Sequence, residues 1–510
     1  MIRYNKRDWL FAGLATLIVL ILAGCQITPG VSWGDDYAAY IQEGISIAEG
    51  SFRDQTKINY QYHPSPLPDE AKKDESLVYA WGYPLVLSAV YRIVGFDRVG
   101  YTSIIWYKIP LLLSLAFTGG VLTLLFRRRF SIYISAGAAL VFCMSGNMFD
   151  AVNSLYSDLL FLFLSILAFL LMECFVSTLG EQSAGGNRSV WLGLAYGVVL
   201  WLTYETRLSG FTVCAAALVG HSVTILSKQA YIKKETVCLH ALPYLLLILM
   251  VLISEHLWLA PATPNLSDIG KTSEVRVFEY YRKELFNFFD QLPMVPFSGL
   301  GYVLIGACVL GLMVKGWKEN LYLTLLLIGT LVVDLSLPYT NGLRYVYNVL
   351  PIMIMYAVYG FQTIARLLNW SSEKSGVKLI REAVKFVGLA AAMAIVFFST
   401  SNQVFKSSLN LANWGENHSY DAYSTEAKEM YSYINEVLPA DAGICVGKPR
   451  LMYLSTGHQS FKVGVNGHEM KEADFYLKNK VANLDDTTSV DTDGMEMVKE
   501  NQYFVLYRVK

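Results

Sequence analysis

The chain has 510 residues, of which 54% are hydrophobic and only 16% are charged. This apolar share exceeds that of an ordinary soluble domain and predicts a polytopic membrane protein. The 41 basic and 42 acidic residues leave a net charge of -1, which argues against a nucleic-acid partner and against a polybasic membrane anchor. Any function therefore has to come from local arrangements of residues.

The first apolar run, residues 9–28, is predicted to span the membrane with the N-terminus in the cytoplasm. The next basic cluster, "RRR" at 127–129, lies in the cytoplasm only if one of the two intervening apolar runs crosses the bilayer. We assign 106–126 to the membrane. The run 84–96, which is short and interrupted by Arg92, is placed on the outer membrane surface.

Cys25 gives the first run a second interpretation, because a basic N-terminus, an apolar stretch and "LAGC" also describe a lipoprotein signal with a lipidated cysteine. We favour an uncleaved helix, since many later spans already anchor the chain. The other cysteines show no metal-type spacing and are interpreted as packing residues. The residues that follow the first span lie outside the cytoplasm in both cases.

Nine more apolar runs continue along the chain. They lie near residues 131–149, 155–176, 190–205, 208–226, 237–260, 299–314, 321–337, 346–365 and 386–401. The basic loops fit the cytoplasmic side throughout, which makes about 11 transmembrane helices in total. The predicted fold is thus a polytopic α-helical membrane domain over 1–401, with two long outer segments at 29–105 and 261–298.

Residues 402–510 have a more polar composition and are predicted to form a small extracytoplasmic α/β domain. A helix is expected over "STEAKEMYSYINEVL", residues 424–438. Strands are expected over "GICVGKPRLMYLSTG" (443–457) and "QYFVLYRVK" (502–510). The basic triplet "KPR" at 448–450 is assigned to the surface of this domain.

The first outer segment contains "GDDYAAYIQEGISIAEG", residues 34–50. Its apolar and polar residues divide between two faces at helical spacing, which predicts an interfacial helix. This helix begins at two adjacent carboxylates, Asp35 and Asp36. Because Asp is a favoured N-cap residue, capping of this helix is an alternative to a catalytic role for Asp35.

Ionisable residues gather at the outer ends of the predicted spans. They are Asp150, Asp158, Glu205, Arg207, Glu255, His256, Asp334 and Arg344. Such residues are costly in a membrane and therefore indicate a functional site, here one that faces outward. Arg207 and Arg344, with Tyr345, suit a phosphate group, since guanidinium donors are planar and permanently charged. A neighbouring carboxylate that takes the proton of an attacking hydroxyl completes an outline of sugar transfer.

Residues 34–50 resemble the first outer loop of the GT-C superfamily of polyprenyl-phosphate-dependent glycosyltransferases, in particular its bacterial family 39 members. Similar pieces follow in the same order. They are "WGYPLVLSAVYRIVG" (81–95), "NSLYSDLLFLFL" (153–164), "GLRYVYNVLP" (342–351) and "GKPRLMYLSTG" (447–457). The resemblance covers most of the chain, and the family includes protein O-mannosyltransferases and aminoarabinose transferases of lipid A.

The resemblance implies an inverting transferase in the bacterial cytoplasmic membrane, with Asp35 as the catalytic base. Relatives more often carry Glu at the second acidic position, where this chain has Asp36. The implied partners are a polyprenyl-phosphate-linked sugar donor, membrane lipids, and an acceptor that is a lipid, a protein or an envelope polymer. The site is expected to face the extracytoplasmic side.

Several of these residues also have a purely structural interpretation. Asp158 is placed to cap its span, and Arg207 and Arg344 to anchor helix ends in the headgroup layer. Glu255 and His256 are further candidates for the site, although for these two and for Asp334 we favour pairing inside the helix bundle. A divalent cation remains open, because some superfamily members use one and the acidic pair together with Asp158 offers oxygen ligands.

Two other functions compete with sugar transfer. A secondary transporter also places charges within a helical bundle, but near the midplane and with paired broken helices in two related halves, and neither feature is evident. A non-catalytic scaffold for envelope assembly would use the charged outer rim only for docking. We favour sugar transfer, although the sugar and the acceptor cannot be read from hydropathy.

Overall fold

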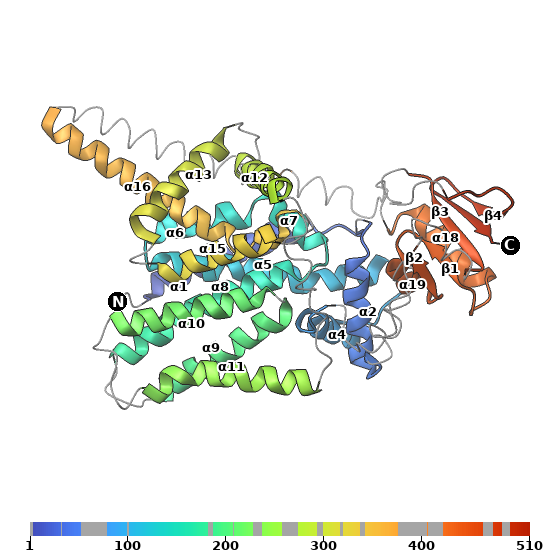
Figure 1. Ribbon diagram of the computed structural model, residues 1–510, viewed down its shortest axis with the longest axis horizontal. Coiled ribbons are helices and arrows are strands. Elements are labelled where there is room, and N and C mark those ends of the chain that lie inside the picture. Colours follow the sequence, from blue (N-terminus) through green and yellow to red (C-terminus); the bar gives the residue numbers. More distant parts are fainter. Residues whose placement is uncertain are drawn as a thin grey trace.

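The computed structural model describes residues 4–31, 33–52, 79–98, 101–181, 187–207, 209–227, 237–257, 274–292, 299–316, 320–336, 342–375, 405, 422–462, 473–481 and 490–509. These residues form a bundle of helices and, at one end of it, a small domain with a β-sheet (Figure 1). Helices α2 (Asp36–Glu49) and α4 (Gly82–Val94) lie between the bundle and this domain (Figure 1).

Apolar helices build the bundle. They are α1 (Lys6–Gly24), α5 (Tyr101–Arg127), α6 (Ile132–Cys143), α7 (Gly146–Asn153), α8 (Asp158–Glu181), α9 (Asn187–Thr206), α10 (Gly210–Ser227), α11 (Val237–Leu257), α13 (Leu300–Gly311), α15 (Leu321–Ser336) and α16 (Leu350–Ser375). A π-helical turn, η4 (Leu312–Gly316), continues α13, and a 3-10 turn, η5 (Leu343–Val346), precedes α16. Helix α12 (Glu274–Gln291) lies in the second outer segment.

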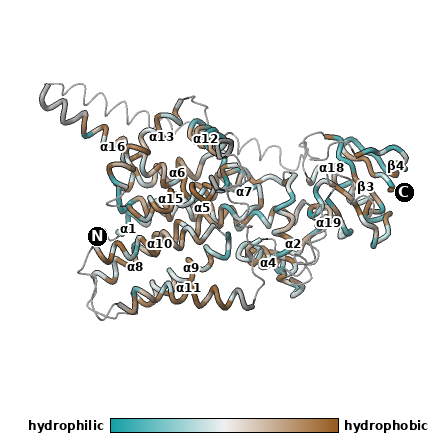
Figure 2. The backbone as a smooth tube through the Cα atoms, in the orientation of Figure 1, coloured by the Kyte–Doolittle hydropathy of each residue, from teal (hydrophilic) through white to brown (hydrophobic). Residues whose placement is uncertain are grey.

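Hydrophobic residues predominate along the helices of the bundle (Figure 2), and many of their large apolar side chains are exposed. Leu10, Leu245 and Met313, for example, are 59%, 61% and 73% exposed. A surface of this kind favours aggregation in water but suits contact with lipid tails. The chain is therefore a multi-pass membrane protein, as its composition predicted.

The described residues do not settle the number of spans. Four helical segments are long and apolar enough to cross a membrane. They are Lys6–Gly24, Ser103–Arg127, Asp158–Gly180 and Leu350–Leu367. The number rises to five if the bent pair α6–α7 is one span, and the described part of the chain holds five shorter apolar helices besides. Eleven spans thus stay a prediction, and the expected span 386–401 lies outside the described residues.

The expected span 131–149 is not one straight helix. Helix α6 ends at Cys143, α7 begins at Gly146, and the two axes differ by 52°. Ser145 between them has extended backbone angles, with φ -66° and ψ 150°, which an α-helix cannot contain. Helix α7 consequently turns and packs against α5 and the start of α8.

Helix α2 begins where predicted, at the acidic pair, but its polar face is not open to solvent. Gln42, Glu43 and Ser46 are at most 4% exposed, since α4 and the C-terminal domain both pack on α2. The crossing with α4 is close at Gly44, where a Cβ atom would lie 3.0 Å from the carbonyl oxygen of Pro84. The amphipathic pattern therefore reflects contact with protein on both faces.

The C-terminal domain combines two helices with a mixed five-stranded sheet of order β2-β1-β3-β5-β4. The strands are β1 (Ile444–Val446), β2 (Ser460–Lys462), β3 (Phe475–Asn479), β4 (Glu496–Glu500) and β5 (Phe504–Arg508). Strand β1 is parallel to β2 and β3, whereas β3, β5 and β4 pair antiparallel. Helix α18 (Thr425–Val437) and strand β5 confirm the predictions for their stretches.

The prediction of a strand over 443–457 is wrong after β1. From Pro449 onward the chain forms a helix of eight residues, α19 (Pro449–Thr456). Pro449 occupies the first turn, where its missing N–H costs nothing, and Gly457 ends the helix with φ 75°. Helix α19 packs directly on α2 and so brings the C-terminal domain to the acidic pair.

Candidate active site

Asp35 occupies the N-cap position of α2, yet its side chain makes no capping hydrogen bond to that helix. Its Oδ1 instead accepts hydrogen bonds from the backbone N–H groups of Arg450 (3.0 Å) and Leu451 (3.2 Å). These two N–H groups belong to the first turn of α19, where a helix leaves its donors without internal partners. Asp35 thus caps a helix of the C-terminal domain, and the alternative that it caps α2 does not hold.

Asp36 begins α2 and has different neighbours. The hydroxyl of Tyr79 donates to its Oδ1 at 2.7 Å, and Nη2 of Arg344 donates to its Oδ2 at 3.1 Å. Nη1 of Arg450 lies 3.9 Å from Oδ1 of the same carboxylate. Both carboxylate oxygens of Asp36 are therefore engaged by protein groups.

The two carboxyl groups of the pair differ in their acidity. Burial raises the pKa of Asp35, against the opposing effect of the Arg450 charge and of the N–H donors. Burial acts on Asp36 as well, but the Tyr79 hydrogen bond and the Arg344 charge outweigh it and lower the pKa of Asp36. A pair whose environments shift the two pKa values in opposite directions is typical of acid and base chemistry.

Arg450 corrects the assignment of "KPR" to the surface. Its side chain is 16% exposed and reaches the acidic pair, with Nη1 3.4 Å from the Tyr79 hydroxyl and Nε 3.8 Å from Oδ2 of Asp35. Neither Arg450 nor Tyr79 was among the predicted site residues. A local signal did exist for the helix that carries Arg450, because Pro449, an apolar pattern at helical spacing and a closing Gly457 together are a helix signature.

The predicted phosphate-binding residues lie together beside this pair. Arg207 forms an ion pair with Asp158, and its guanidinium lies over the ring of Tyr345, 4.8 Å from the centroid. Arg344 lies 5.4 Å from the same ring and 4.5 Å from the ring of Tyr156. The Tyr345 ring thus connects the two guanidinium groups, and Asp158 orients one of them.

Two donors in the site have no acceptor. The Nε atoms of Arg344 and Arg450 are buried, and neither has a hydrogen-bond partner among the described residues. Buried polar groups are satisfied in the great majority of cases, so an unsatisfied pair of N–H donors in one site needs an explanation. A ligand that brings anionic oxygens suits Nε of Arg344, whereas Nε of Arg450 faces Oδ2 of Asp35 at 3.8 Å.

Glu255 and His256 are not placed by the structure. Both belong to the last turn of α11, and their side chains lie outside the described residues. Glu205, at the end of α9, is buried and accepts a hydrogen bond from the Ser254 hydroxyl. This contact holds α9 to α11 and accounts for Glu205 without a role in chemistry.

Lys108 in α5 is a buried charge that the sequence analysis overlooked, although it lies within a predicted span. Its Nζ donates hydrogen bonds to the carbonyl oxygens of Thr28 (2.7 Å) and Gly30 (2.6 Å) and to Oδ1 of Asn153 (3.0 Å). These bonds fix the chain just before the acidic pair. Lys108 therefore positions the site without being part of it.

The acidic residues do not offer a site for a divalent cation. Among the described residues no group of three or more His, Cys, Asp or Glu side chains comes together. Asp158 pairs with Arg207, Asp36 with Arg344, and Asp35 with the N–H groups of α19. A metal ion would add positive charge beside two arginines, which Coulomb repulsion disfavours. We derive no step through a metal.

An apolar groove of about 470 Å³ opens between α4, α5 and α8. Its lining includes Val90 and Ile93 of α4, Trp106 of α5, and Leu160 and Phe163 of α8. The groove reaches the first turns of α8, the helix that begins at the charged site. The lining is suited to contact with part of an apolar chain.

Comparisons of the fold agree with this geometry, although no family model and no curated protein matches the chain. The structure of ArnT from Cupriavidus metallidurans bound to undecaprenyl phosphate is similar over 99% of this chain and 98% of that one, with a TM-score of 0.54 and 12% identity. The archaeal oligosaccharyltransferase AglB from Archaeoglobus fulgidus, in complex with an inhibitory peptide and a dolichol-phosphate, has a TM-score of 0.53 and 9% identity, over 93% of this chain and 69% of that chain.

The chain thus shares its fold with ArnT and AglB. ArnT without ligand is similar as well, with a TM-score of 0.53, 12% identity, and coverage of 98% of this chain and 97% of that chain. The similarity extends over the helical bundle and the C-terminal domain together. The resemblance inferred from short motifs is therefore confirmed at the level of the fold.

Proposed function

We propose that this protein transfers a sugar from a polyprenyl-phosphate donor to a hydroxyl group of an envelope acceptor. The observation that carries the proposal is a pair of carboxylates with opposed environments, Asp35 and Asp36, beside the guanidinium of Arg344, whose buried Nε has no acceptor in the described part of the chain. ArnT and AglB, whose structures hold polyprenyl-type phosphates, share the fold.

The reaction needs a base for the acceptor hydroxyl and a cation for the leaving phosphate. The hydroxyl oxygen attacks the anomeric carbon of the sugar, and its proton passes to the carboxylate of Asp35. The bond between the anomeric carbon and the phosphate oxygen breaks on the opposite side, and its electron pair stays on the phosphate. The products are the glycosylated acceptor with inverted configuration, the protonated base and a polyprenyl phosphate monoester.

Arg344 and Arg207 hold the donor phosphate in this proposal. Arg344 contacts Asp36 through Nη2 and keeps its Nε donor for a phosphate oxygen. Arg207 is held by Asp158 and stacks on Tyr345, so its position is fixed before the donor arrives. A preorganised guanidinium stabilises the charge that builds on the phosphate as the sugar departs, at no cost of reorganisation.

The lipid of the donor lies along the apolar groove between α4, α5 and α8. The groove is lined by apolar side chains and starts near the first turn of α8, whose Phe161 ring lies 5.7 Å from the Arg207 guanidinium. The phosphate then sits at the headgroup level and the tail in the membrane. We place the site at the outer face of the cytoplasmic membrane, with a cytoplasmic N-terminus and an extracytoplasmic C-terminal domain, because the basic loops between the apolar runs fit the cytoplasmic side.

The test uses purified protein in lipid nanodiscs with a panel of undecaprenyl-phosphate-linked monosaccharides labelled in the sugar. An envelope extract supplies acceptors, and the release of undecaprenyl phosphate is measured together with transfer of label. We expect turnover with at least one member of the panel and none with Asp35→Asn. A folded wild-type protein that turns over no member of the panel contradicts the proposal.

A further inference from the structure

Helix α19 is held at both ends by residues from outside its own domain. Asp35 accepts from the N–H groups at its start, and Nη1 of Arg98 donates to the carbonyl oxygens of Tyr453 (3.1 Å) and Leu454 (3.3 Å) at its end. A carboxylate at the N-terminus and a cation at the C-terminus both complement the helix dipole. Gln42 of α2 adds a hydrogen bond to the carbonyl oxygen of Arg450, at 2.6 Å.

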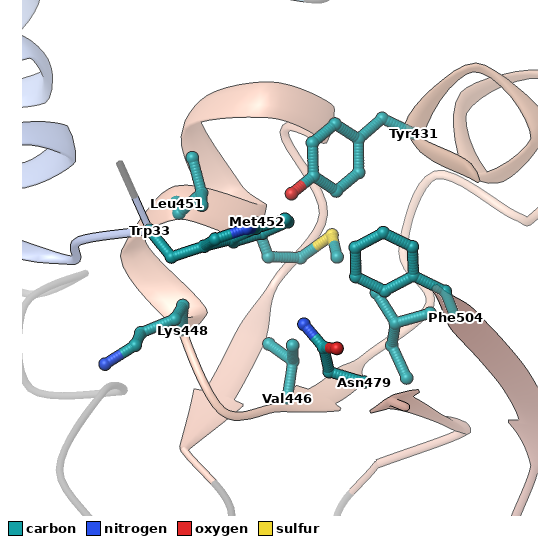
Figure 3. Close-up of a pocket in the computed structure, with 9 residues that line it drawn as sticks. Trp33, Tyr431, Val446, Lys448, Leu451, Met452, Asn479 and Phe504 are labelled. Carbon is teal, nitrogen blue, oxygen red and sulfur yellow. The ribbon is translucent and has the colours of Figure 1, made fainter. Parts of the chain in front are cut away.

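The chain just before Asp35 is held by the same domain. Trp33 inserts its ring into a small cavity of the C-terminal domain, beside Met452 and across from Tyr431 (Figure 3). Its ring lies 5.5 Å from that of Phe504 in β5. The backbone N–H of Ala422 donates to the carbonyl oxygen of Val31 at 3.1 Å. Docking of the C-terminal domain thus fixes the peptide that carries the base.

The two carboxylate oxygens of Asp35 have different contacts. Oδ1 accepts the two N–H groups of α19, whereas Oδ2 faces Nε of Arg450 at 3.8 Å, beyond hydrogen-bond range. We infer that Arg450 is a positioning residue, which aims Oδ2 at the acceptor hydroxyl and keeps Asp35 ionised, so that transfer requires the docked C-terminal domain. This inference rests on the proposed function and extends it.

The electrostatic role of Arg450 can be separated from its neighbours. The described charged and titratable groups that face the acidic pair are Arg450 of α19, Lys448 just before that helix, Arg344 of η5, Tyr79, and Tyr156 between α7 and α8. Of these, Arg450 has the largest opposing effect on the pKa of Asp35, which burial raises. Loss of its charge raises that pKa further, so the base is protonated over a wider acid range.

The experiment measures kcat and the donor KM against pH for wild type, Arg450→Gln and Arg450→Lys, with the undecaprenyl-phosphate sugar that the wild type uses. We expect the acid limb of kcat to move up by about 1 pH unit or more in Arg450→Gln, because an opposite charge at this distance shifts a pKa by about 1 to 3 units. Arg450→Lys keeps the charge and moves the limb less. The donor KM stays within about twofold, since a positioning residue does not bind the donor.

Arg508→Gln is the matched control, because Arg508 lies in the same domain and pairs with Glu496 on an exposed strand. It should leave the pH profile unchanged. Thermal unfolding of each variant shows whether the fold is retained, and the Lys variant keeps the test valid if the Gln variant is unstable. An unshifted acid limb in a folded Arg450→Gln overturns the inference, and so does a large rise in donor KM. If the wild type transfers no sugar or Asp35→Asn stays active, the proposed function fails instead.

Discussion

Two groups of largely buried charges lie toward opposite ends of α8, and they differ in how far their hydrogen-bond donors are satisfied. Near Asp158, Arg344 and Arg450 face the acidic pair, and the Nε donor of each has no acceptor among the described residues. Toward the other end, Arg128 and Arg129 both pair with Glu173. There the Nε donors are satisfied, by Tyr4 Oη at 2.8 Å and by Asn320 Oδ1 at 2.6 Å.

The two clusters differ in whether they leave a hydrogen-bond donor for a ligand. Glu173 and its arginines join the segment between α5 and α6 to α8 and α15, and the arginine donors described above bind protein atoms. Such a network stabilises one arrangement and leaves nothing for a ligand. At the acidic pair the network of described residues is incomplete, and a phosphate oxygen would supply the acceptor that Nε of Arg344 lacks. If this difference is functional, substitutions at the acidic pair should lower the rate of sugar transfer, and substitutions at Glu173 and its arginines should lower stability instead.

The largest effect is expected for Asp35→Asn. Removing a general base costs about 10² to 10⁴ in rate, and Asn still accepts the N–H groups of α19 through its amide oxygen. The variant should therefore fold, insert and unfold thermally much as the wild type does. Single-turnover kinetics with the labelled donor measure the loss, and a wild-type rate would transfer the role of base to Asp36.

Arg344→Ala should come next, with a loss of about 10² in kcat and a higher donor KM, because a preorganised cation on the leaving phosphate is removed. Arg344→Lys keeps the charge but not the planar donors, so its loss should be partial, about tenfold. Steady-state kinetics on both variants test this order. Equal activity of Lys and wild type would mean that Arg344 only anchors its helix end.

A substitution in the lining of the apolar groove should have a smaller effect, on the donor KM, and the effect should depend on the length of the lipid tail. Phe163→Ala removes an aromatic ring from the lining, and the lost apolar contact of about 1.5 kcal/mol should raise the KM of an undecaprenyl donor about tenfold. A donor with one or two isoprene units should show no change. Leu245→Ala, an exposed apolar residue of α11 outside the groove lining, is the control. A similar change with both lipids places the tail elsewhere.

The smallest effect on transfer is expected at the structural cluster. Arg129→Gln leaves Glu173 with one partner fewer, and breaking a buried ion pair costs about 3 to 5 kcal/mol. The melting temperature should fall and the yield of folded protein with it, while kcat per folded molecule stays unchanged. A reduced kcat in the folded fraction would show that the two clusters are coupled through α8.

Local sequence patterns predicted the start of α2, most of the apolar helices and the helix α18. They also selected Asp35, Asp36, Arg207, Arg344 and Asp158, which the structure brings together. These successes share a physical basis, because hydrophobic periodicity, caps and the cost of buried charge act within a few residues.

The missed features depend on contacts between distant segments. Arg450 and Asp35 are 415 residues apart, so no local pattern reports their contact. The polar face of α2 was assigned to solvent because a sequence does not show which domain will cover it. The error at α19 was of another kind, since apolar residues in a short stretch fit a strand and a helix equally, and only Pro449 and Gly457 favoured the helix.

Two neighbouring carbonyl groups in the chain before the acidic pair are bound from different sides. The helical bundle holds the oxygen of Gly30 through Lys108, and the C-terminal domain holds the oxygen of Val31 through Ala422. The two attachments lie on adjacent residues, whose Cα atoms are about 3.8 Å apart. This stretch therefore links the helical bundle directly to the C-terminal domain. If the C-terminal domain moves away from the bundle by more than about 3.8 Å, one of the two hydrogen bonds must break first. Such a movement also displaces the carboxylate of Asp35.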